Sequence, residues 1–155
     1  MKYYAVIDTN IVISSMLKPE SNPGQIINYV SMGVIVPILN DEILQEYEDV
    51  MSRNDFGFKK EEIYKTMVLF NERSIKLDRT KTIEEFADES DIVFYEVVLT
   101  AKRTIDAFLV TGNIRHFPNK SFVVTPKEMI DIIENDWLWV FKVMIPKYID
   151  IYKIV

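Results

Sequence analysis

Short apolar runs alternate along the chain with longer stretches in which apolar residues recur at helical spacing. Residues 3–7 form a continuous apolar run that ends at Asp8, a pattern that predicts a strand buried on both faces of a sheet. Further strands are predicted at 34–38, 74–77, 107–111 and 122–124, and helices at 11–17, 23–32, 41–52, 59–72, 88–102 and from 126 onward. Strands that alternate with helices predict an α/β fold with a parallel central sheet.

Polar residues stand at the carboxyl ends of two of these predicted strands. Asp8 follows the first strand, and Thr111, Gly112 and Asn113 form a turn where the fourth strand ends. In open parallel sheets, ligands bind beyond the carboxyl ends of the strands. We therefore expect Asp8 and the 111–113 turn to be neighbours at a functional site.

The size and composition of the chain are those of one globular domain. It has 155 residues, of which 48% are hydrophobic and 27% charged, with no low-complexity segment and no internal repeat, so we expect a single domain over 1–155. The net charge of −6 argues against a protein that coats nucleic acid. It does not argue against an enzyme that meets nucleic acid through metal ions, because clustered carboxylates themselves make a chain acidic.

Membrane insertion and thiol chemistry are not expected from this sequence. No apolar run approaches the ~18–20 residues that a transmembrane helix needs, and the first residues lack the pattern of a signal peptide. The chain has no cysteine, which excludes disulfides, zinc–thiolate sites and thiol nucleophiles. We expect a cytoplasmic protein that does not enter a membrane.

Asp8 is the first candidate for chemistry, because it places a charge directly after a buried strand at the expected ligand-binding edge of the sheet. The alternative is a helix N-cap, a role for which Asp8, Thr9 and Asn10 are all suited. Two further acids, which lie on or beside apolar faces of predicted helices, favour the functional interpretation.

Glu46 is the second candidate, because it lies at the edge of an apolar helical stripe. It shares its side of the predicted helix with Ile43 and Val50, whereas Glu48 points to the opposite, solvated side. Glu42, one turn earlier, lies further from the stripe and is the weaker candidate. An ordinary glutamate at the boundary of the helix is the alternative interpretation.

Asp91 is the third candidate, because it shares a helix face with the apolar residues Phe94, Tyr95 and Val98. A carboxylate on such a face needs a partner, since an ionised and unpaired buried group is costly. The alternative is capping, with Asp88 as the N-cap and Asp91 in the first turn. Both roles are compatible, because a first-turn acid gains from the helix dipole.

Three carboxylates from separate segments suit a hard cation such as Mg²⁺ or Mn²⁺. His116 is the only histidine, so a multi-histidine zinc site is not expected, and a serine nucleophile would have only His116 as a base. The four glycines are scattered at 24, 33, 57 and 112 and form no phosphate-binding loop. Metal-assisted hydrolysis of a phosphodiester is therefore the leading chemistry.

Five segments, taken in order, resemble the PIN-domain family, and within it the branch described as toxin components of toxin–antitoxin systems. They are VIDTNI at 6–11, ILQEY at 43–47, DESD at 88–91, VTGNIRHFP at 110–118 and VTPKE at 124–128. The resemblance covers about residues 3–134. It implies a three-layer α/β fold in which a parallel sheet of strand order 3-2-1-4-5 is flanked by helices, with acids converging at its carboxyl edge.

The resemblance also implies a role for each matched residue. Asp8, Glu46 and Asp91 would hold Mg²⁺ or Mn²⁺. Asn10 and Thr111 would not bind the metal themselves but would orient these ligands or a bound water by hydrogen bonds.

Asn113 is a departure from the fuller acidic pattern of the family. The wider family often has a fourth acid at this position, and an amide does not supply the charge of a carboxylate. A second metal would then bind weakly or only together with substrate, and Asp88 would supply part of the missing charge.

The activity implied by the resemblance is cleavage of single-stranded RNA. A metal-activated water would attack the phosphorus in line, and the metal would stabilise the developing negative charge. Arg115 and His116, with Lys102 or Arg103, are candidates for contacts with RNA phosphates, although His116 is equally suited to a surface position that stabilises a turn. A cognate antitoxin is the expected protein partner, and a homodimer is compatible with the sequence.

Two other functions compete with a nuclease. A PIN-like module that only binds a partner is favoured by Asn113 and disfavoured by the three retained acids. A phosphoryl-transfer or receiver-type α/β domain would require a second acid near Asp8, and the position two residues on is Asn10.

The C-terminal segment lies outside the resemblance. Its apolar residues Trp137, Leu138, Trp139, Val140 and Phe141 are expected to close the core. A contact with a second copy or with the antitoxin is the alternative.

Overall fold

The computed structural model describes residues 1–84, 86 and 88–151, with side chains described as far as residue 139. Its centre is a five-stranded parallel sheet in the order β3-β2-β1-β4-β5. The strands are β1 (Tyr3–Ile7), β2 (Ile35–Leu39), β3 (Ile75–Lys76), β4 (Ala107–Val110) and β5 (Val123–Val124). The α/β class, the parallel sheet and the strand order predicted from the sequence are confirmed.

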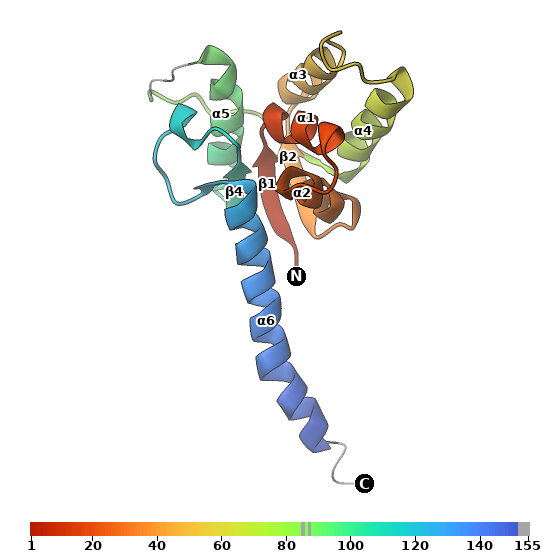
Figure 1. The fold of residues 1–155 in the computed structure, drawn as a ribbon. Coiled ribbons are helices and arrows are strands. Elements are labelled where there is room, and N and C mark those ends of the chain that lie inside the picture. Colours follow the sequence, from red (N-terminus) through yellow and green to blue (C-terminus); the bar gives the residue numbers. More distant parts are fainter. Residues whose placement is uncertain (85, 87, 152–155) are drawn as a thin grey trace.

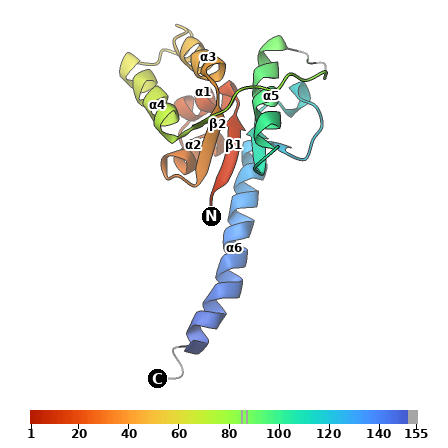
Figure 2. The same ribbon diagram turned by 180° about the vertical axis from the view of Figure 1, so that it is seen from behind.

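Helices flank this sheet on both faces (Figures 1 and 2). They are α1 (Thr9–Leu17), α2 (Asn22–Ser31), α3 (Asp41–Met51), α4 (Lys60–Arg73), α5 (Ile92–Ala101) and α6 (Pro126–Ile151), with short 3-10 turns η1 (Glu89–Asp91) and η2 (Ile114–His116). α5 packs against β1, β2 and β4, whereas α1 and α6 both pack against α2, and α3 packs against α1 and α4. The helices divide between the two faces because the connections between parallel strands are right-handed. The chain first runs outward from β1 through β2 to β3, and then crosses back over β1 to form β4 on its other side.

The strand register brings the ends of β1 and β4 level with each other. Ile7 pairs with Val110, and the backbone N–H of Asp8 donates to the carbonyl of Val110 at 3.0 Å. The residues that follow the two strands, Asp8 and Thr111, therefore meet at the carboxyl edge of the sheet. β1 is the middle strand, and its last three residues are fully buried, so Asp8 follows directly from the core.

Polar caps set where the helices of this edge begin. Asp8 caps α1, so this helix begins at Thr9 rather than at the predicted Ile11. Asp88 caps η1, and α5 follows only from Ile92, so the predicted continuous helix from 88 opens as a tighter 3-10 turn.

α6 leaves the body at the end opposite to the carboxyl edge of β1, and both views show it projecting away (Figures 1 and 2). Its first half is anchored by Met129, Ile130 and Ile133, which are buried in the core. Further along α6, the carboxylate of Asp136 accepts a hydrogen bond from the Tyr3 hydroxyl at 2.8 Å. The next two residues, Trp137 and Leu138, still line a hollow together with Tyr29 of α2 and Val34, which immediately precedes β2.

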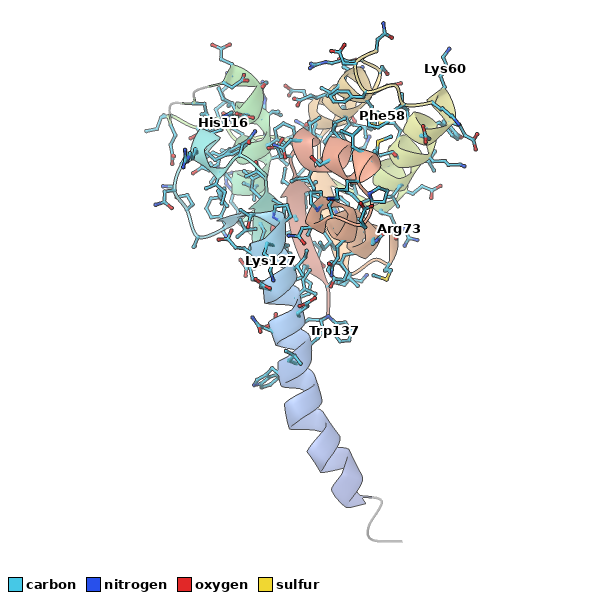
Figure 3. The ribbon with its side chains drawn as sticks, in the orientation of Figure 1. Phe58, Lys60, Arg73, His116, Lys127 and Trp137 are labelled. Carbon is cyan, nitrogen blue, oxygen red and sulfur yellow. The ribbon has the colours of Figure 1, made fainter. Side chains whose placement is uncertain are left out.

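The expectation that the C-terminal apolar residues close the core is not met by the first three of them. Trp137, Leu138 and Trp139 are 39%, 54% and 62% exposed, so none of the three belongs to the buried core. Figure 3 shows Trp137 on the projecting part of the helix. Val140 and Phe141 lie outside the residues whose side chains are described. No helix in the described part of the chain is long and apolar enough to cross a membrane.

Candidate metal centre

Asp8 lies at the centre of the candidate site and is only 5% exposed. Its Oδ2 accepts hydrogen bonds from the Thr111 hydroxyl and the Asn10 side-chain amide, each at 2.6 Å, and its Oδ1 accepts one from the backbone N–H of Asn10 at 3.3 Å. Burial raises the pKa of Asp8, the hydrogen bonds oppose this, and the charge of Asp91 raises the pKa further. Asp8 thus caps α1 and also faces the other acids.

Asn10 and the 111–113 turn fix the orientation of the Asp8 side chain through hydrogen bonds. The side-chain oxygen of Asn10 accepts a hydrogen bond from the backbone N–H of Gly112 at 3.1 Å. A Cβ atom at position 112 would lie 3.2 Å from this oxygen, so glycine permits the close approach. Thr111 is fully buried, and its hydroxyl donates to Asp8 while accepting from the N–H of Asn113 at 2.9 Å. These contacts are consistent with the orienting role predicted for Asn10 and Thr111.

Glu46 reaches the same edge from α3. Its Oε1 accepts a hydrogen bond from the Thr9 hydroxyl at 2.6 Å, which ties it to the residue next to Asp8. Burial raises the pKa of Glu46, and the charges of Asp8, Asp91 and Asp88 raise it further, while the Thr9 hydrogen bond lowers it. The structure thus brings Glu46 to Asp8.

Two residues that support this arrangement were not singled out by the sequence. Thr9 is buried and was considered only as a cap, although a hydroxyl next to Asp8 was the available signal. The hydroxyl of Tyr47, which is fully buried, donates to the carbonyl of Ile7 and joins α3 to the end of β1. Burial, with the nearby charges of Asp8 and Glu46, holds the pKa of Tyr47 well above its ordinary value, so this hydroxyl stays a donor.

Asp91 contributes the third carboxylate from η1, on the other face of the sheet. The predicted helix face is present, since Phe94, Tyr95 and Val98 are all buried. Asp91 Oδ2 lies 3.1 Å from Nδ1 of His116. Burial raises the pKa of Asp91, the neighbouring His116 lowers it, and Asp88 raises it.

The three acids share one electrostatic property that bears on metal binding. Asp8, Glu46 and Asp91 all have raised pKa values, so their negative charges are incompletely compensated. An all-carboxylate set suits a hard divalent cation, whose charge would supply the missing compensation. In the described residues, no three His, Asp or Glu side chains are arranged closely enough to hold a metal ion. Each carboxylate keeps lone pairs beyond the hydrogen bonds described above, so binding of one metal ion would require the three side chains to move closer together without leaving those partners.

The segments that carry these acids match a known protein family. The sequence model of the PIN domain matches residues 4–115, which include the three acids. The chain belongs to the PIN-domain family. An uncharacterized protein of Methanocaldococcus jannaschii is 26% identical over 125 residues, which cover 73% of this chain and 72% of that protein. PIN domains are generally nucleases that use divalent metal ions.

Asp88 lies at the periphery of this PIN domain's acidic cluster. It is exposed, and its Oδ1 accepts hydrogen bonds from the backbone N–H and the hydroxyl of Ser90, both at 2.9 Å. These hydrogen bonds lower the pKa of Asp88. Asp88 therefore remains ionised beside Asp91 and adds to the negative potential of the edge.

The segment after β4 lines a hollow beside the acids of this PIN domain. A hollow of about 280 Å³ is lined by Gly112, Asn113, Ile114, Arg115, His116 and Thr125. Asn113, Arg115 and His116 are exposed there, and Figure 3 shows His116 at the end of the molecule opposite to the projecting part of α6. The turn thus combines an amide, a guanidinium and an imidazole next to Asp91.

Lys102 and Arg103 do not lie at this edge. They follow the end of α5 and precede β4, which places them at the amino edge of the sheet. Nζ of Lys102 pairs with Asp106 at 3.1 Å and lies 5.0 Å from the centre of the Phe122 ring. The expectation that either residue contacts an RNA phosphate at the acidic site is therefore not supported, because α5 separates them from Asp91.

Proposed function

We propose that this PIN domain is a cytoplasmic, single-domain endoribonuclease that hydrolyses single-stranded RNA with Mg²⁺ or Mn²⁺ held by Asp8, Glu46 and Asp91. The observation that carries the proposal is the convergence of three poorly compensated carboxylates at the carboxyl edge of β1. Membership of a family of metal-dependent nucleases supports it.

Each proposed ligand has its own support within the protein. The bound cation would supply positive charge where negative charge develops on the phosphate. Thr111 and Asn10 orient Asp8, and Thr9 orients Glu46, through the hydrogen bonds described above. His116 steadies Asp91.

RNA would approach along the hollow beside the acids. Arg115 and His116 are exposed at its rim, and a guanidinium is suited to bidentate contact with a phosphate. Contacts of this kind give affinity without sequence preference.

A toxin neutralised by an antitoxin is the biological role we propose. Its support is the order and spacing of the five matched segments. Coexpression with the product of an adjacent short reading frame should restore growth that expression of this chain alone arrests. Growth arrest that is unchanged in Asp8→Ala would contradict a toxic role for the nuclease site.

The biochemical test is cleavage of single-stranded RNA with and without a chelator. Asp8→Ala, Glu46→Ala and Asp91→Ala should each abolish metal-dependent cleavage, because ligands of one site act as a unit and their losses do not add. Glu48→Ala is the matched control, since Glu48 is an exposed acid on the same helix as Glu46, and it should cleave like wild type. Cleavage that resists the chelator would refute the metal mechanism.

The second candidate function is a PIN-like module that binds a partner without catalysis. The observation in its favour is Asn113, an exposed amide where the wider family often has an acid. Metal binding by wild type without any RNA cleavage would favour this module over the nuclease.

A further inference from the structure

The side chain of Arg79 contacts two helices that lie in different layers of the fold. Its Nε lies 3.1 Å from Oε1 of Glu42 in α3, and its Nη1 lies 3.4 Å from Oε2 of Glu96 in α5. The planar guanidinium presents several donors in a fixed fork, so one side chain can serve both carboxylates.

Glu96 makes this bridge more than a surface ion pair. Its side chain is only 5% exposed, whereas that of Glu42 is 56% exposed. A buried carboxylate is costly unless it is paired and hydrogen-bonded. Glu96 meets this need with Arg79 and with the backbone N–H of Thr82, which donates to its Oε1 at 2.7 Å.

The backbone on both sides of Arg79 is held in place. The N–H of Leu77 donates to the carbonyl of Leu39 in β2 at 3.0 Å. The N–H of Thr80 donates to the carbonyl of Glu96 at 3.4 Å, and the hydroxyls of Thr80 and Thr100 lie 2.9 Å apart. The bridge therefore starts from a fixed segment at the carboxyl edge, and its two ends act on α3 and α5.

Each of these two helices positions an acid of the proposed metal centre: Glu46 lies within α3, and Asp91 lies directly before α5. Glu42 lies one turn before Glu46 in α3, and Glu96 lies five residues after Asp91, which immediately precedes α5. We propose that Arg79 is a positioning residue, which sets the separation of Glu46 and Asp91 through Glu42 and Glu96. This inference rests on the proposed function, because it assigns Arg79 an effect on the affinity for the divalent cation.

The charge of Arg79 and its proposed positioning role predict opposite changes in metal affinity when Arg79 is replaced. Loss of a positive charge near clustered acids should, on charge alone, tighten the binding of a cation. Loss of a positioning bridge should weaken it, because the acids are no longer held at the right separation. Weaker binding is therefore diagnostic of positioning.

The experiment measures Mn²⁺ binding alone, by titration calorimetry and by the metal-induced rise in melting temperature. Arg79→Met should bind Mn²⁺ about tenfold more weakly than wild type, the usual scale for a residue that supports metal ligands from behind. Arg79→Lys should fall between the two, since an ammonium keeps the charge but loses the fork.

Lys76→Met is the matched control. Lys76 precedes Arg79 by three residues and pairs with Asp41 of α3 at 2.7 Å, but both side chains are exposed and the pair does not involve Glu96. Its removal deletes the same charge without breaking the bridge between α3 and α5. We expect Mn²⁺ binding that is unchanged or slightly tighter.

A further variant separates positioning from folding. Arg79→Met leaves Glu96 buried without its cation and can reduce stability, whereas Glu42→Ala breaks the exposed end of the bridge and, with it, a 3.5 Å contact to the side-chain amide of Asn40. Glu42→Ala should weaken Mn²⁺ binding to a similar extent, and the double variant Glu42→Ala/Arg79→Met should be no weaker than Arg79→Met alone. Additive losses would overturn the inference, because Glu42 would then act on the metal independently.

The failure of this inference differs from failure of the proposed function. Wild-type affinity in Arg79→Met and Glu42→Ala, together with lost Mn²⁺ binding in Asp8→Asn, would overturn the role of Arg79 and leave the metal centre intact. Absence of Mn²⁺ binding in wild type would overturn both.

Discussion

Asp8 illustrates how one residue serves both the fold and the site. Its carboxylate caps α1, accepts hydrogen bonds from Thr111 and Asn10, and faces the charge of Asp91. The raised pKa shows that desolvation and repulsion outweigh the stabilising hydrogen bonds. The metal-free protein thus carries an electrostatic cost at the position where a cation would bring most benefit.

The first prediction concerns Asp8→Asn and its dependence on pH. A carboxyl whose pKa is raised by folding stabilises the protein below its ordinary pKa of 3.8, and this contribution is lost as the pH rises through the raised value. In EDTA, Asp8→Asn should therefore be at least as stable as wild type at pH 7, and its relative stability should fall as the pH is lowered towards 3.8.

Denaturant unfolding at several pH values checks this prediction. The same comparison with Mn²⁺ should reverse the order, since metal binding to the folded state stabilises wild type only. Equal metal-induced shifts in the two proteins would count against Asp8 as a ligand.

The second prediction concerns Asn113, where the chain departs from the acidic pattern. Asn113→Asp adds a charge beside the cluster and should lower the Mg²⁺ concentration for half-maximal RNA cleavage by about two- to fivefold, the scale of an exposed charge interaction. It should also lower the melting temperature in EDTA. Asn119→Asp, an exposed change in the loop that follows η2, is the control and should do neither. If both quantities stay unchanged in Asn113→Asp, residue 113 points away from the metal centre.

At the scale of elements, much of the architecture could be predicted because buried strands leave a strong local pattern. The run at 3–7 that ends in Asp8 correctly predicted β1 and placed Asp8, a candidate ligand, at the end of this strand. The opening of α5 was predicted less well, since a 3-10 turn and an α-helix share the same N-cap signal at Asp88. The projection of α6 was not predicted, because apolar composition does not reveal where the sheet ends beside a helix.

Pairs of side chains distant in the sequence were the least predictable part of the site. Thr9 meets Glu46 across 37 positions, and Arg79 reaches Glu42 and Glu96 from a segment with no helical pattern. Such pairs depend on how α3 and α5 pack around the sheet, and no local periodicity encodes that packing. The three acids could be proposed as candidates from the sequence because charges on apolar faces are unusual within a single element.

The third prediction tests where α6 stops contributing to the core. Ile133→Ala should reduce the free energy of unfolding by about 2–4 kcal/mol, because it leaves a cavity in a buried position. Trp139→Ala should change it by no more than about 0.5 kcal/mol in the monomer, since Trp139 is 62% exposed. Chemical denaturation of dilute protein measures both values. A large loss in Trp139→Ala would mean that the helix packs on the body beyond residue 138.

At the scale of the whole molecule, the proposed nuclease site and the projecting helix lie at opposite ends. The acids stand at the carboxyl edge of the sheet, and α6 extends from the other end (Figures 1 and 2). The family match ends at residue 115, so α6 lies outside it. Changes in the projecting part of α6 and changes in the acids should therefore act independently on metal binding.

The central claim is that Asp8, Glu46 and Asp91 together hold the divalent cation used for RNA cleavage. The most direct measurement is a crystal structure of the protein with Mn²⁺, with data collected at a wavelength where manganese scatters anomalously. We expect one strong anomalous peak coordinated by carboxylate oxygens of all three residues, and no such peak in crystals of Asp8→Asn. A peak at other residues, or no peak at Mn²⁺ concentrations that support RNA cleavage, would contradict it.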